Sequence, residues 1–267
     1  MGIANILVQT MIRLTFLLRR KPEQTLEEFQ HYWLHEHGPL VASHANHLNL
    51  LRYVQVHTLD DPMNDAMNEA RGGKMEAPYD GVAELWWENE DLLQAALVSS
   101  EGEKAGAELL EDEAKFIDFP NSPLWLNCEY PQVNPTPENI IASVKSNIVK
   151  LHFPLRYQTS IPEDEVRAYW LQNHGPIIRS HAPASGILRY QQVHRIEHPL
   201  ETALREPRGT IVEPYLGHAE VWFRMDRVQT AASKAANLAA VEDESKFIDF
   251  ERSTMFIANE QVIVDRR

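Results

Sequence analysis

The sequence predicts an α+β protein made of two ferredoxin-like β-α-β-β-α-β repeats, whose antiparallel sheets pack into one intramolecular barrel. Two observations predict this fold. The chain carries the same blocks twice in the same order, and within each copy short apolar strands and helical segments follow the β-α-β-β-α-β order. A four-stranded sheet with helices on one face leaves its other face bare, so two tandem sheets can bury those faces against each other.

The duplication rests on four pairs of matching blocks. YWLHEHGPLVASH (32–44) matches YWLQNHGPIIRSH (169–181), and LRYVQVH (51–57) matches LRYQQVH (188–194), both at an offset of 137. APYDGVAELWW (77–87) matches EPYLGHAEVWF (213–223) at 136, and EDEAKFIDF (111–119) matches EDESKFIDF (242–250) at 131. The second copy therefore lacks one residue before the third block and further residues within the intervening helix.

Each copy is expected to contain the same elements in order. Apolar strands at 12–18 and 149–155 come first, followed by helices that open with capping boxes at Thr25–Glu28 and Ser160–Glu163. Second strands are expected at 50–57 and 187–194, and short helices near 62–70 and 199–206. Third strands at 81–87 and 217–223, alanine-rich helices at 91–110 and 228–241, and closing strands at 124–129 and 254–259 complete the copies.

A proline-rich segment separates the two copies. PQVNPTPEN (131–139) contains three prolines and no apolar period, which is typical of an extended linker. We expect domains at 1–132 and 145–267, joined by a linker at 133–144.

Composition excludes several classes of function. The 267 residues carry 25 basic and 39 acidic side chains, a formal net charge of -14, which disfavours nucleic acids and anionic membranes as partners. Cys128 is the only cysteine, so no internal disulfide or thiolate metal cluster can form. The N-terminus lacks a signal-peptide pattern, and no run of 18 apolar residues occurs. We expect a cytoplasmic protein.

Polar side chains alternate along the predicted strands. The second strands place Tyr, Gln and His on one face, and the third strands place Glu and Trp on one face; these residues are Tyr53, Gln55, His57, Glu84 and Trp86, repeated as Tyr190, Gln192, His194, Glu220 and Trp222. If these faces point inward, each half has a concave, aromatic-walled site for a flat small molecule. A solvated sheet face or a buried polar network would give the same alternation.

The duplication also sorts the histidines. His37 and His57 recur as His174 and His194, whereas His31 and His35 align with Ala168 and Gln172 and are expected to be solvent-exposed. A histidine near its reference pKa of ~6.5 can give and take a proton at neutral pH. We therefore predict His37 and His57 as an acid–base pair whose charge or tautomer Glu84 fixes. Histidines that only hydrogen-bond to the core backbone are the alternative.

The second copy adds two histidines on the predicted inward faces. His152 replaces Thr15 and His218 replaces Val82. Together with His194 and Glu220 they would form a three-histidine, one-carboxylate metal site. No short metal-ligand motif supports such a site, so our leading expectation is a protein without metal or other cofactor.

Two motifs in each half resemble a known family. A helix with an aromatic pair followed by His-Gly-Pro, and then a strand ending R-Y-x-Q-x-H, resemble the EthD family of the dimeric α+β barrel superfamily. The resemblance covers most of the chain and implies relatives that include cofactor-independent monooxygenases forming quinones, cyclases, decarboxylases and lactone isomerases. It implies catalytic roles for His37, His57, His174 and His194. The long segments carrying Arg71-Gly72 and Arg208-Gly209 depart from the minimal family unit and are expected to form lids.

These observations together predict an enzyme. We expect cofactor-independent lyase, isomerase or oxygenase chemistry on a small aromatic or carbonyl-containing catabolite, with histidine moving the proton. The predicted substrate-binding residues are Tyr53, Gln55, Glu84, Trp86 and Arg71, and their counterparts Tyr190, Gln192, Glu220, Trp222 and Arg208. A non-catalytic ligand-binding or stress-response protein and a metal-dependent enzyme are the alternatives. A small molecule is the expected partner, and a homodimer of such chains is compatible with the sequence.

Overall fold

The computed structural model describes residues 11–134 and 140–267, and in it the chain folds around one closed barrel of eight strands. The N-terminal segment and the centre of the predicted linker lie outside the described residues, and the predicted domain boundaries stay predictions. The first repeat contains β1 Ile12–Leu18, α1 Leu26–Tyr32, α2 Gly38–His44, β2 Arg52–Thr58, α3 Pro62–Glu69, β3 Gly81–Trp87, α4 Glu90–Val98, α5 Ser100–Glu113 and β4 Leu124–Val133. The second contains β5 Ile148–Tyr157, α6 Glu163–Tyr169, α7 Gly175–Ser185, β6 Ile187–Arg195, α8 Pro199–Arg205, β7 Gly217–Arg224, α9 Ala231–Glu244, β8 Ile248–Asp249 and β9 Phe256–Asp265.

The barrel closes because the last long strand of each repeat pairs with the other repeat. The strand order is β4-β1-β3-β2-β9-β5-β7-β6, all neighbours are antiparallel, and β6 pairs back with β4. At the two seams Cys128 lies opposite His194, and Asn259 lies opposite His57. The predicted intramolecular barrel is confirmed, and hydrogen bonds between strand edges join the two sheets.

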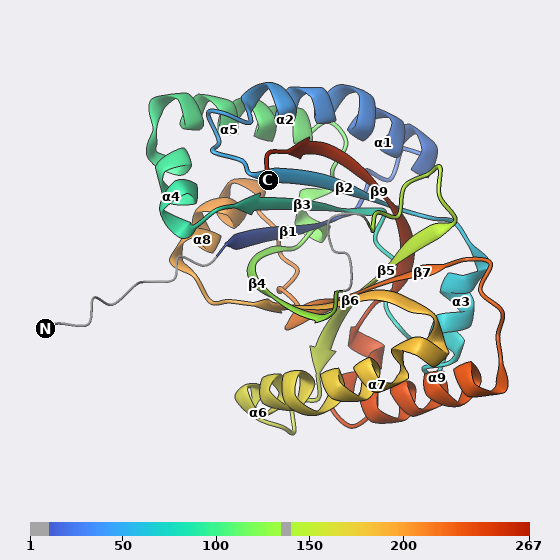
Figure 1. Cartoon of the computed structure of the whole chain (residues 1–267). Coiled ribbons are helices and arrows are strands. Elements are labelled where there is room, and N and C mark those ends of the chain that lie inside the picture. Colours follow the sequence, from blue (N-terminus) through green and yellow to red (C-terminus); the bar gives the residue numbers. More distant parts are fainter. Residues whose placement is uncertain (1–10, 135–139) are drawn as a thin grey trace, which may run out of the picture.

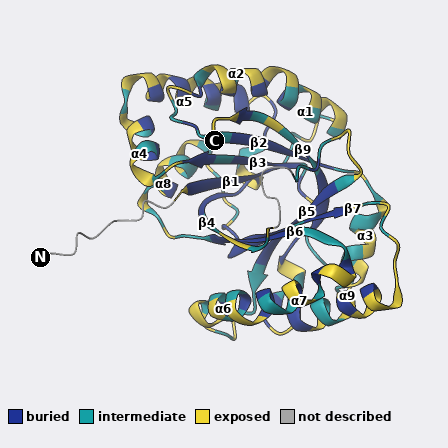
Figure 2. Ribbon diagram, viewed as in Figure 1, coloured by how far each residue is buried: buried dark blue, intermediate teal, exposed yellow. Residues whose placement is uncertain are grey.

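Helices cover the outside of the barrel on two opposite sides. Figure 1 shows α1, α2, α4 and α5 on one side, and α6, α7 and α9 on the other. Two apolar cores lie between the strands and these helices, and a third fills part of the barrel interior, where Val54, Val56, Trp125 and Phe256 meet. The strands are buried throughout most of their length, and the exposed residues lie on the outer faces of the helices (Figure 2). No helix in the described parts of the chain is long and apolar enough to cross a membrane.

The first helix of each repeat widens into a π-helical turn before the His-Gly-Pro motif. These turns span Trp33–His37 and Trp170–His174, and α2 and α7 begin directly afterwards with proline in their first turn. Proline lacks the N–H that an uninterrupted helix needs, and its ring crowds the preceding turn. A widened turn relieves this conflict, and such turns are frequent at functional sites. Each one ends on the histidine that recurs in both repeats.

Three predicted boundaries are wrong. The capping box at Thr25 and Glu28 is present, but α6 begins after Pro162 without a side-chain cap. The helix predicted over 91–110 is two helices, because Ser99 is extended and caps α5 by accepting a hydrogen bond from the Gly102 N–H. A side chain at Gly102 would collide with the Ala96 carbonyl, so the residue supports this tight junction. The last strands extend beyond their predicted ends because they pair across the seams.

Candidate functional site

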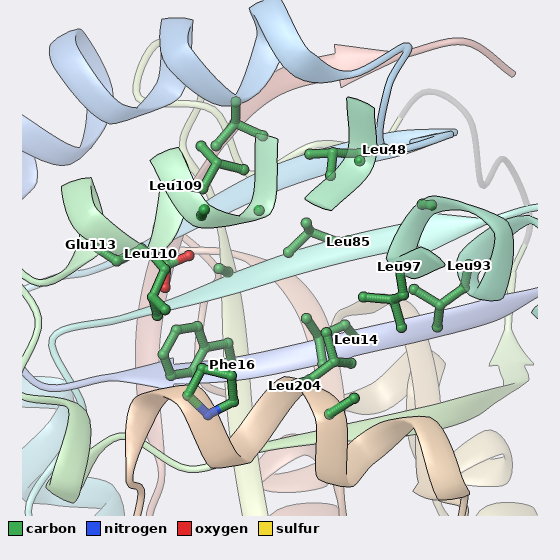
Figure 3. A pocket seen from close by; sticks show the side chains of 18 of the residues that line it. Leu14, Phe16, Leu48, Leu85, Leu93, Leu97, Leu109, Leu110, Glu113 and Leu204 are labelled. Atoms are coloured by element: carbon green, nitrogen blue, oxygen red, sulfur yellow. The ribbon is translucent and has the colours of Figure 1, made fainter. Parts of the chain in front are cut away.

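A mostly apolar cavity lies outside the barrel, between the first repeat's strands and its helices. Its volume is about 340 Å³, within the range of small-molecule sites. Strands β1 to β3 form its floor, α2, α4 and α5 form its walls, and the end of α8 from the second repeat closes one side. Figure 3 shows the apolar side chains around it, among them Leu14, Phe16, Leu85, Leu97 and Leu204. The site therefore uses both repeats.

His37 lines this cavity and is fixed by a carboxylate. Its Nδ1 lies 2.8 Å from Oδ2 of Asp112, and the ring is 4% exposed and packs against Phe116. Tyr32 donates a hydrogen bond to the other carboxylate oxygen at 2.7 Å, and Lys115 contacts that oxygen at 3.0 Å. Because Asp112 accepts the Nδ1 proton, Nε2 is the ring nitrogen left with a lone pair for a ligand.

The hydrogen-bond partners of Asp112 favour its ionised form. Burial raises the pKa of this carboxyl, but hydrogen bonds from Tyr32, Lys115 and His37 outweigh burial and leave the pKa below its ordinary value. An ionised Asp112 holds one imidazole tautomer and would stabilise the imidazolium that forms when Nε2 takes a proton. The pair of His37 and Asp112 therefore leaves Nε2 as the one ring nitrogen of His37 that could accept a proton from a ligand.

Three further polar groups reach the cavity. The Tyr53 hydroxyl accepts hydrogen bonds from Trp33 Nε1 at 2.9 Å and from Gln55 Nε2 at 3.2 Å, so its own proton is available to a ligand. Glu113 and Arg208 also line the cavity and form an ion pair of 2.7 Å across the two repeats. The segment predicted to form a lid places Arg208, which follows α8, at the edge of this cavity, and its role as a lid stays a prediction.

The second repeat contains a smaller version of the same site. Its cavity measures about 120 Å³ and is lined by His174, Tyr190, Glu244 and Arg71, among others. His174 Nδ1 lies 2.8 Å from Asp243, and Arg71 pairs with Glu244 at 2.7 Å. In repeat 1, α4 contributes Leu93, Ala96 and Leu97 to the cavity wall, whereas repeat 2 passes from β7 to α9 without such a helix. The gap between the third and fourth sequence blocks therefore lies at α4.

His57 and His194 do not line either cavity. Each ring stacks on a tryptophan, His57 on Trp33 at 4.7 Å and His194 on Trp170 at 4.1 Å. Their Nε2 atoms lie 3.0 and 3.1 Å from the side-chain oxygens of Gln55 and Gln192. Burial lowers the pKa of His57 to about 4 and that of His194 to about 3, so both are neutral at pH 7. The structure places them in buried polar networks that support Tyr53 and Tyr190.

These two histidines give the protein a predictable pH dependence. Because their pKa values are lowered on folding, the unfolded chain takes up their protons first, near its reference pKa of about 6.5. The contribution of His57 and His194 to stability is fully present above about pH 6.5 and is lost as the pH falls towards 4. We expect each histidine to contribute up to about 1.4 kcal/mol per pH unit in this window. Urea unfolding at pH 7.5, 5.5 and 4.5 measures it.

The matched variant for this pH dependence is His57→Asn combined with His194→Asn. We expect the double variant to show a shallower loss of stability below pH 6.5 than the wild type. His31→Ala should leave the slope unchanged, because that side chain is exposed in the folded as well as the unfolded chain. An unchanged slope in the double variant would mean that other groups control acid unfolding.

The predicted pocket residues of the third strands lie on the other side of the sheet. Glu84, Trp86, Glu220 and Trp222 point into the barrel interior, where they are buried. The prediction that Tyr53, Gln55 and His57 lie on the same side of the sheet as Glu84 and Trp86 is wrong. In the register of β2, it is Val54 and Val56 that face the interior, and the alternating Tyr-Gln-His face turns to the helices. The same holds for the second repeat, because Gln192 donates to the carbonyl of Trp170.

Buried cations neutralise the carboxylates inside the barrel. Arg13 contacts Glu84 at 2.7 Å, Glu129 at 2.8 Å and Glu220 at 2.5 Å, and it is 1% exposed. Lys150 contacts Glu84 at 2.5 Å and Glu220 at 2.9 Å. Burial raises the pKa of Glu84 to about 7, although Arg13 and Lys150 act against this change. Glu84 is therefore part of an ion network and does not reach His37.

The predicted four-residue metal set is only partly assembled. His152, His218 and Glu220 lie together in the barrel interior, with potential ligand atoms within 4.8 Å of one another. His194 belongs on the opposite face, because its neighbour Val193 is the residue paired with His218. The predicted inclusion of His194 is wrong.

Sequence reasoning missed the carboxylates that complete both sites. Asp112 and Asp243 orient the cavity histidines, and Glu113 and Glu244 hold the arginines that close the cavities. All four lie in the duplicated EDEAKFIDF and EDESKFIDF blocks, which an apolar clasp after a helix explained equally well. The duplication of these blocks was the signal that could have identified the four carboxylates. The sequence alone did not show which histidine each would contact, because the partners lie far apart along the chain.

The closed barrel of two ferredoxin-like repeats, with helices on its outer faces, defines a dimeric α+β barrel protein. The model of the EthD domain matches residues 21–120 and 158–251, which are most of the chain. This chain therefore belongs to the EthD domain family, with one copy of the domain in each repeat.

Several solved structures are similar to this chain at low identity. An anthrone oxidase-like protein is 12% identical with a TM-score of 0.52, and the match covers 97% of this chain and 95% of that one. An EthD family protein from Bacillus halodurans C-125 is 20% identical with a TM-score of 0.31, over 44% of this chain and 96% of that one. A mutant chlorite dismutase from Candidatus Nitrospira defluvii is 9% identical with a TM-score of 0.44, over 94% and 92%. No curated protein matches the chain by sequence.

Proposed function

We propose that this protein is an oxygenase-type enzyme that removes a proton from a flat aromatic ketone or phenol bound in the larger cavity. The observation that carries the proposal is the dyad of His37 and Asp112 at the wall of an apolar cavity of about 340 Å³. One positioned base in an otherwise apolar pocket suits a substrate whose C–H or O–H proton is already acidic. No cofactor is required for that step.

The cavity supports the choice of substrate class. Its lining is largely leucine, alanine and aromatic side chains, which favour a fused-ring molecule without formal charge. Tyr53 can donate its hydroxyl proton to the oxygen that becomes negative when His37 Nε2 takes the proton. Burial raises the pKa of Tyr53 above its ordinary value, so the hydroxyl remains a donor rather than an anion at neutral pH.

The proposed reaction follows from a base, an activated CH₂ group and dioxygen. His37 Nε2 takes one proton, and the electron pair of that C–H bond becomes the enolate of the ring ketone. The enolate reduces dioxygen and forms a C–O bond, and protonation by the imidazolium gives a hydroperoxide. Loss of water then leaves a carbonyl, so R₂CH₂ and O₂ yield R₂CO and H₂O. This balance turns an anthrone-type ketone into a quinone, as the resemblance to quinone-forming monooxygenases suggests.

The experiment is an oxygen-uptake assay with anthrone as the probe, corrected for its spontaneous oxidation in the same buffer. We expect consumption of one O₂ for each quinone formed, at a rate that depends on enzyme concentration. Anthrone that binds in the cavity without enzyme-dependent turnover would favour a non-catalytic ligand-binding protein instead. If anthrone neither binds nor turns over, this substrate class is refuted.

Arg208 offers a test of the lid. Because Arg208 pairs with Glu113 at the edge of the cavity, Arg208→Met should leave Glu113 unpaired and weaken closure over the ligand. We expect KM for anthrone to rise by about tenfold, the cost of roughly 1.4 kcal/mol of binding free energy. Arg71→Met is the matched control, because Arg71 makes the same ion pair at the smaller cavity. Equal effects of the two variants on KM would contradict a lid specific to the larger cavity.

A further inference from the structure

We propose that His152, His218 and Glu220 form a binding site for one divalent first-row transition metal ion inside the barrel. The site lies on the side of the sheet opposite the two helix-covered cavities, and it does not depend on the proposed enzymatic function. Two imidazoles and one carboxylate form a donor set that suits zinc, iron(II), manganese or cobalt.

The strand register brings the three side chains together. His152 on β5 lies directly opposite Glu220 on β7. His218 precedes Glu220 by two residues and therefore shares its face of the strand. The potential ligand atoms of all three lie within 4.8 Å of one another, and none of the three side chains is more than 2% exposed. The two imidazole rings stack at 4.2 Å.

The two histidines have buried nitrogens without hydrogen-bond partners. Among the described residues, neither Nδ1 nor Nε2 of His152 makes a hydrogen bond, and Nδ1 of His218 makes none. Buried polar atoms in native proteins are almost always satisfied, so such a group of orphan nitrogens indicates a missing partner.

Arg13 and Lys150 would keep other carboxylate partners if Glu220 bound a metal ion. Glu220 Oε1 contacts Arg13 at 2.5 Å and Lys150 at 2.9 Å, and a metal would compete with both. Arg13 retains Glu84 and Glu129, and Lys150 retains Glu84 and has Glu260 at 3.6 Å. A small cavity of about 40 Å³ lined by Glu84 and Glu220 adjoins the network.

The first repeat cannot form the equivalent site. Its corresponding residues are Thr15 and Val82, and the Thr15 hydroxyl accepts a hydrogen bond from Asn127 at 3.0 Å. The duplication thus predicts one metal ion per chain. It also supplies a variant, His152→Thr with His218→Val, that replaces both ligands by residues that the same fold tolerates in repeat 1.

The experiment uses the full chain without a histidine tag, stripped with EDTA and titrated with Co²⁺ while visible absorption is recorded. We expect d–d bands that saturate at one Co²⁺ per chain, a rise in the unfolding temperature on binding, and retention of the ion through desalting. The His152→Thr/His218→Val variant should bind Co²⁺ at least tenfold more weakly. His31→Ala/His35→Ala is the control for the exposed histidine pair, whose rings lie 4.6 Å apart, and it should bind as the wild type does.

Two results would overturn the site. One is the absence of saturable Co²⁺ binding to the wild type, and the other is binding that the His31/His35 variant loses and the His152/His218 variant keeps. If the double variant does not fold by circular dichroism, anomalous diffraction from wild-type crystals soaked in Co²⁺ decides. A peak between His152 and His218 supports the site, and its absence refutes it. Neither readout uses turnover, so failure of the proposed enzymatic function leaves this test intact.

Discussion

His37→Asn is expected to lower kcat for quinone formation by about 10²–10⁴-fold, the usual contribution of one positioned acid–base group. The physical reason is the loss of Nε2, the only imidazole nitrogen that His37 does not commit to Asp112. Asparagine retains a polar side chain of similar reach, so the cavity should stay folded and continue to bind anthrone. Stopped-flow or steady-state oxygen uptake measures the change in kcat, and an anthrone binding titration measures the affinity separately.

The second repeat supplies the matched control for this prediction. His174→Asn removes an imidazole with the same carboxylate partner and similar burial, but at a cavity of about 120 Å³. We expect a change in kcat of less than about threefold, because a cavity of this size lies below the usual range for ligand sites. If His37→Asn retained wild-type turnover, or if His174→Asn caused the larger loss, the assignment of the active cavity would be wrong.

Arg13→Met is expected to lower the free energy of unfolding by about 3–5 kcal/mol, the usual cost of removing one partner from a buried ion pair. Arg13 is 1% exposed and faces three carboxylates, so its loss leaves buried negative charge without compensation. Methionine preserves much of the side-chain volume, and the loss should therefore be electrostatic. Urea unfolding at pH 7.5 with EDTA present measures it.

A double variant separates the charge effect from packing. Arg13→Met combined with Glu84→Gln should be more stable than Arg13→Met alone, because one unpaired carboxylate is removed together with its cation. Lys74→Met is the control at an exposed ion pair, where Lys74 lies 3.2 Å from Glu251 and is 73% exposed. We expect its effect to be too small to resolve. A loss in Lys74→Met as large as that in Arg13→Met would contradict the special role of the barrel interior.

Much of the fold could be predicted from the sequence because the chain repeats itself. Matching blocks at nearly constant offsets fixed the order of elements, and β1 and β3 begin and end where the apolar pattern predicts. The predicted barrel also followed from a general need, since each four-stranded sheet has a bare face. What the pattern could not show was the pairing of β4 with β6 and of β2 with β9, because hydrogen bonds between strand edges leave little trace in side-chain pattern.

The orientation of β2 and β6 was the main failure for the site. Valines at 54 and 56 look like helix-facing core, and the polar Tyr-Gln-His face looks like a pocket, yet both sides of this barrel are buried. When both faces are buried, alternation no longer tells which one faces inward. The carbonyl of Trp33 in the π-helical turn accepts a hydrogen bond from Gln55 and holds it on the helix side. Because alternate residues of a strand share a face, Tyr53 and His57 lie on that side too.

The tandem arrangement explains why both cavities need both repeats. Arg208 of the second repeat closes the first cavity through Glu113, and Arg71 of the first repeat closes the second through Glu244. Each arginine follows the short helix after the second strand, which crosses to the other half of the barrel. Among the described residues, repeat 2 has no counterpart of α4, and its cavity is the smaller of the two.

A crystal structure of the wild-type protein with anthrone bound under anaerobic conditions would show directly whether His37 and Tyr53 contact the substrate. We expect anthrone in the cavity of repeat 1, with its CH₂ carbon beside His37 Nε2 and its ketone oxygen within hydrogen-bond distance of the Tyr53 hydroxyl. Two results would contradict the proposed function. One is anthrone bound only in the cavity of repeat 2, and the other is anthrone in repeat 1 with its CH₂ carbon away from His37 and its ketone oxygen away from Tyr53.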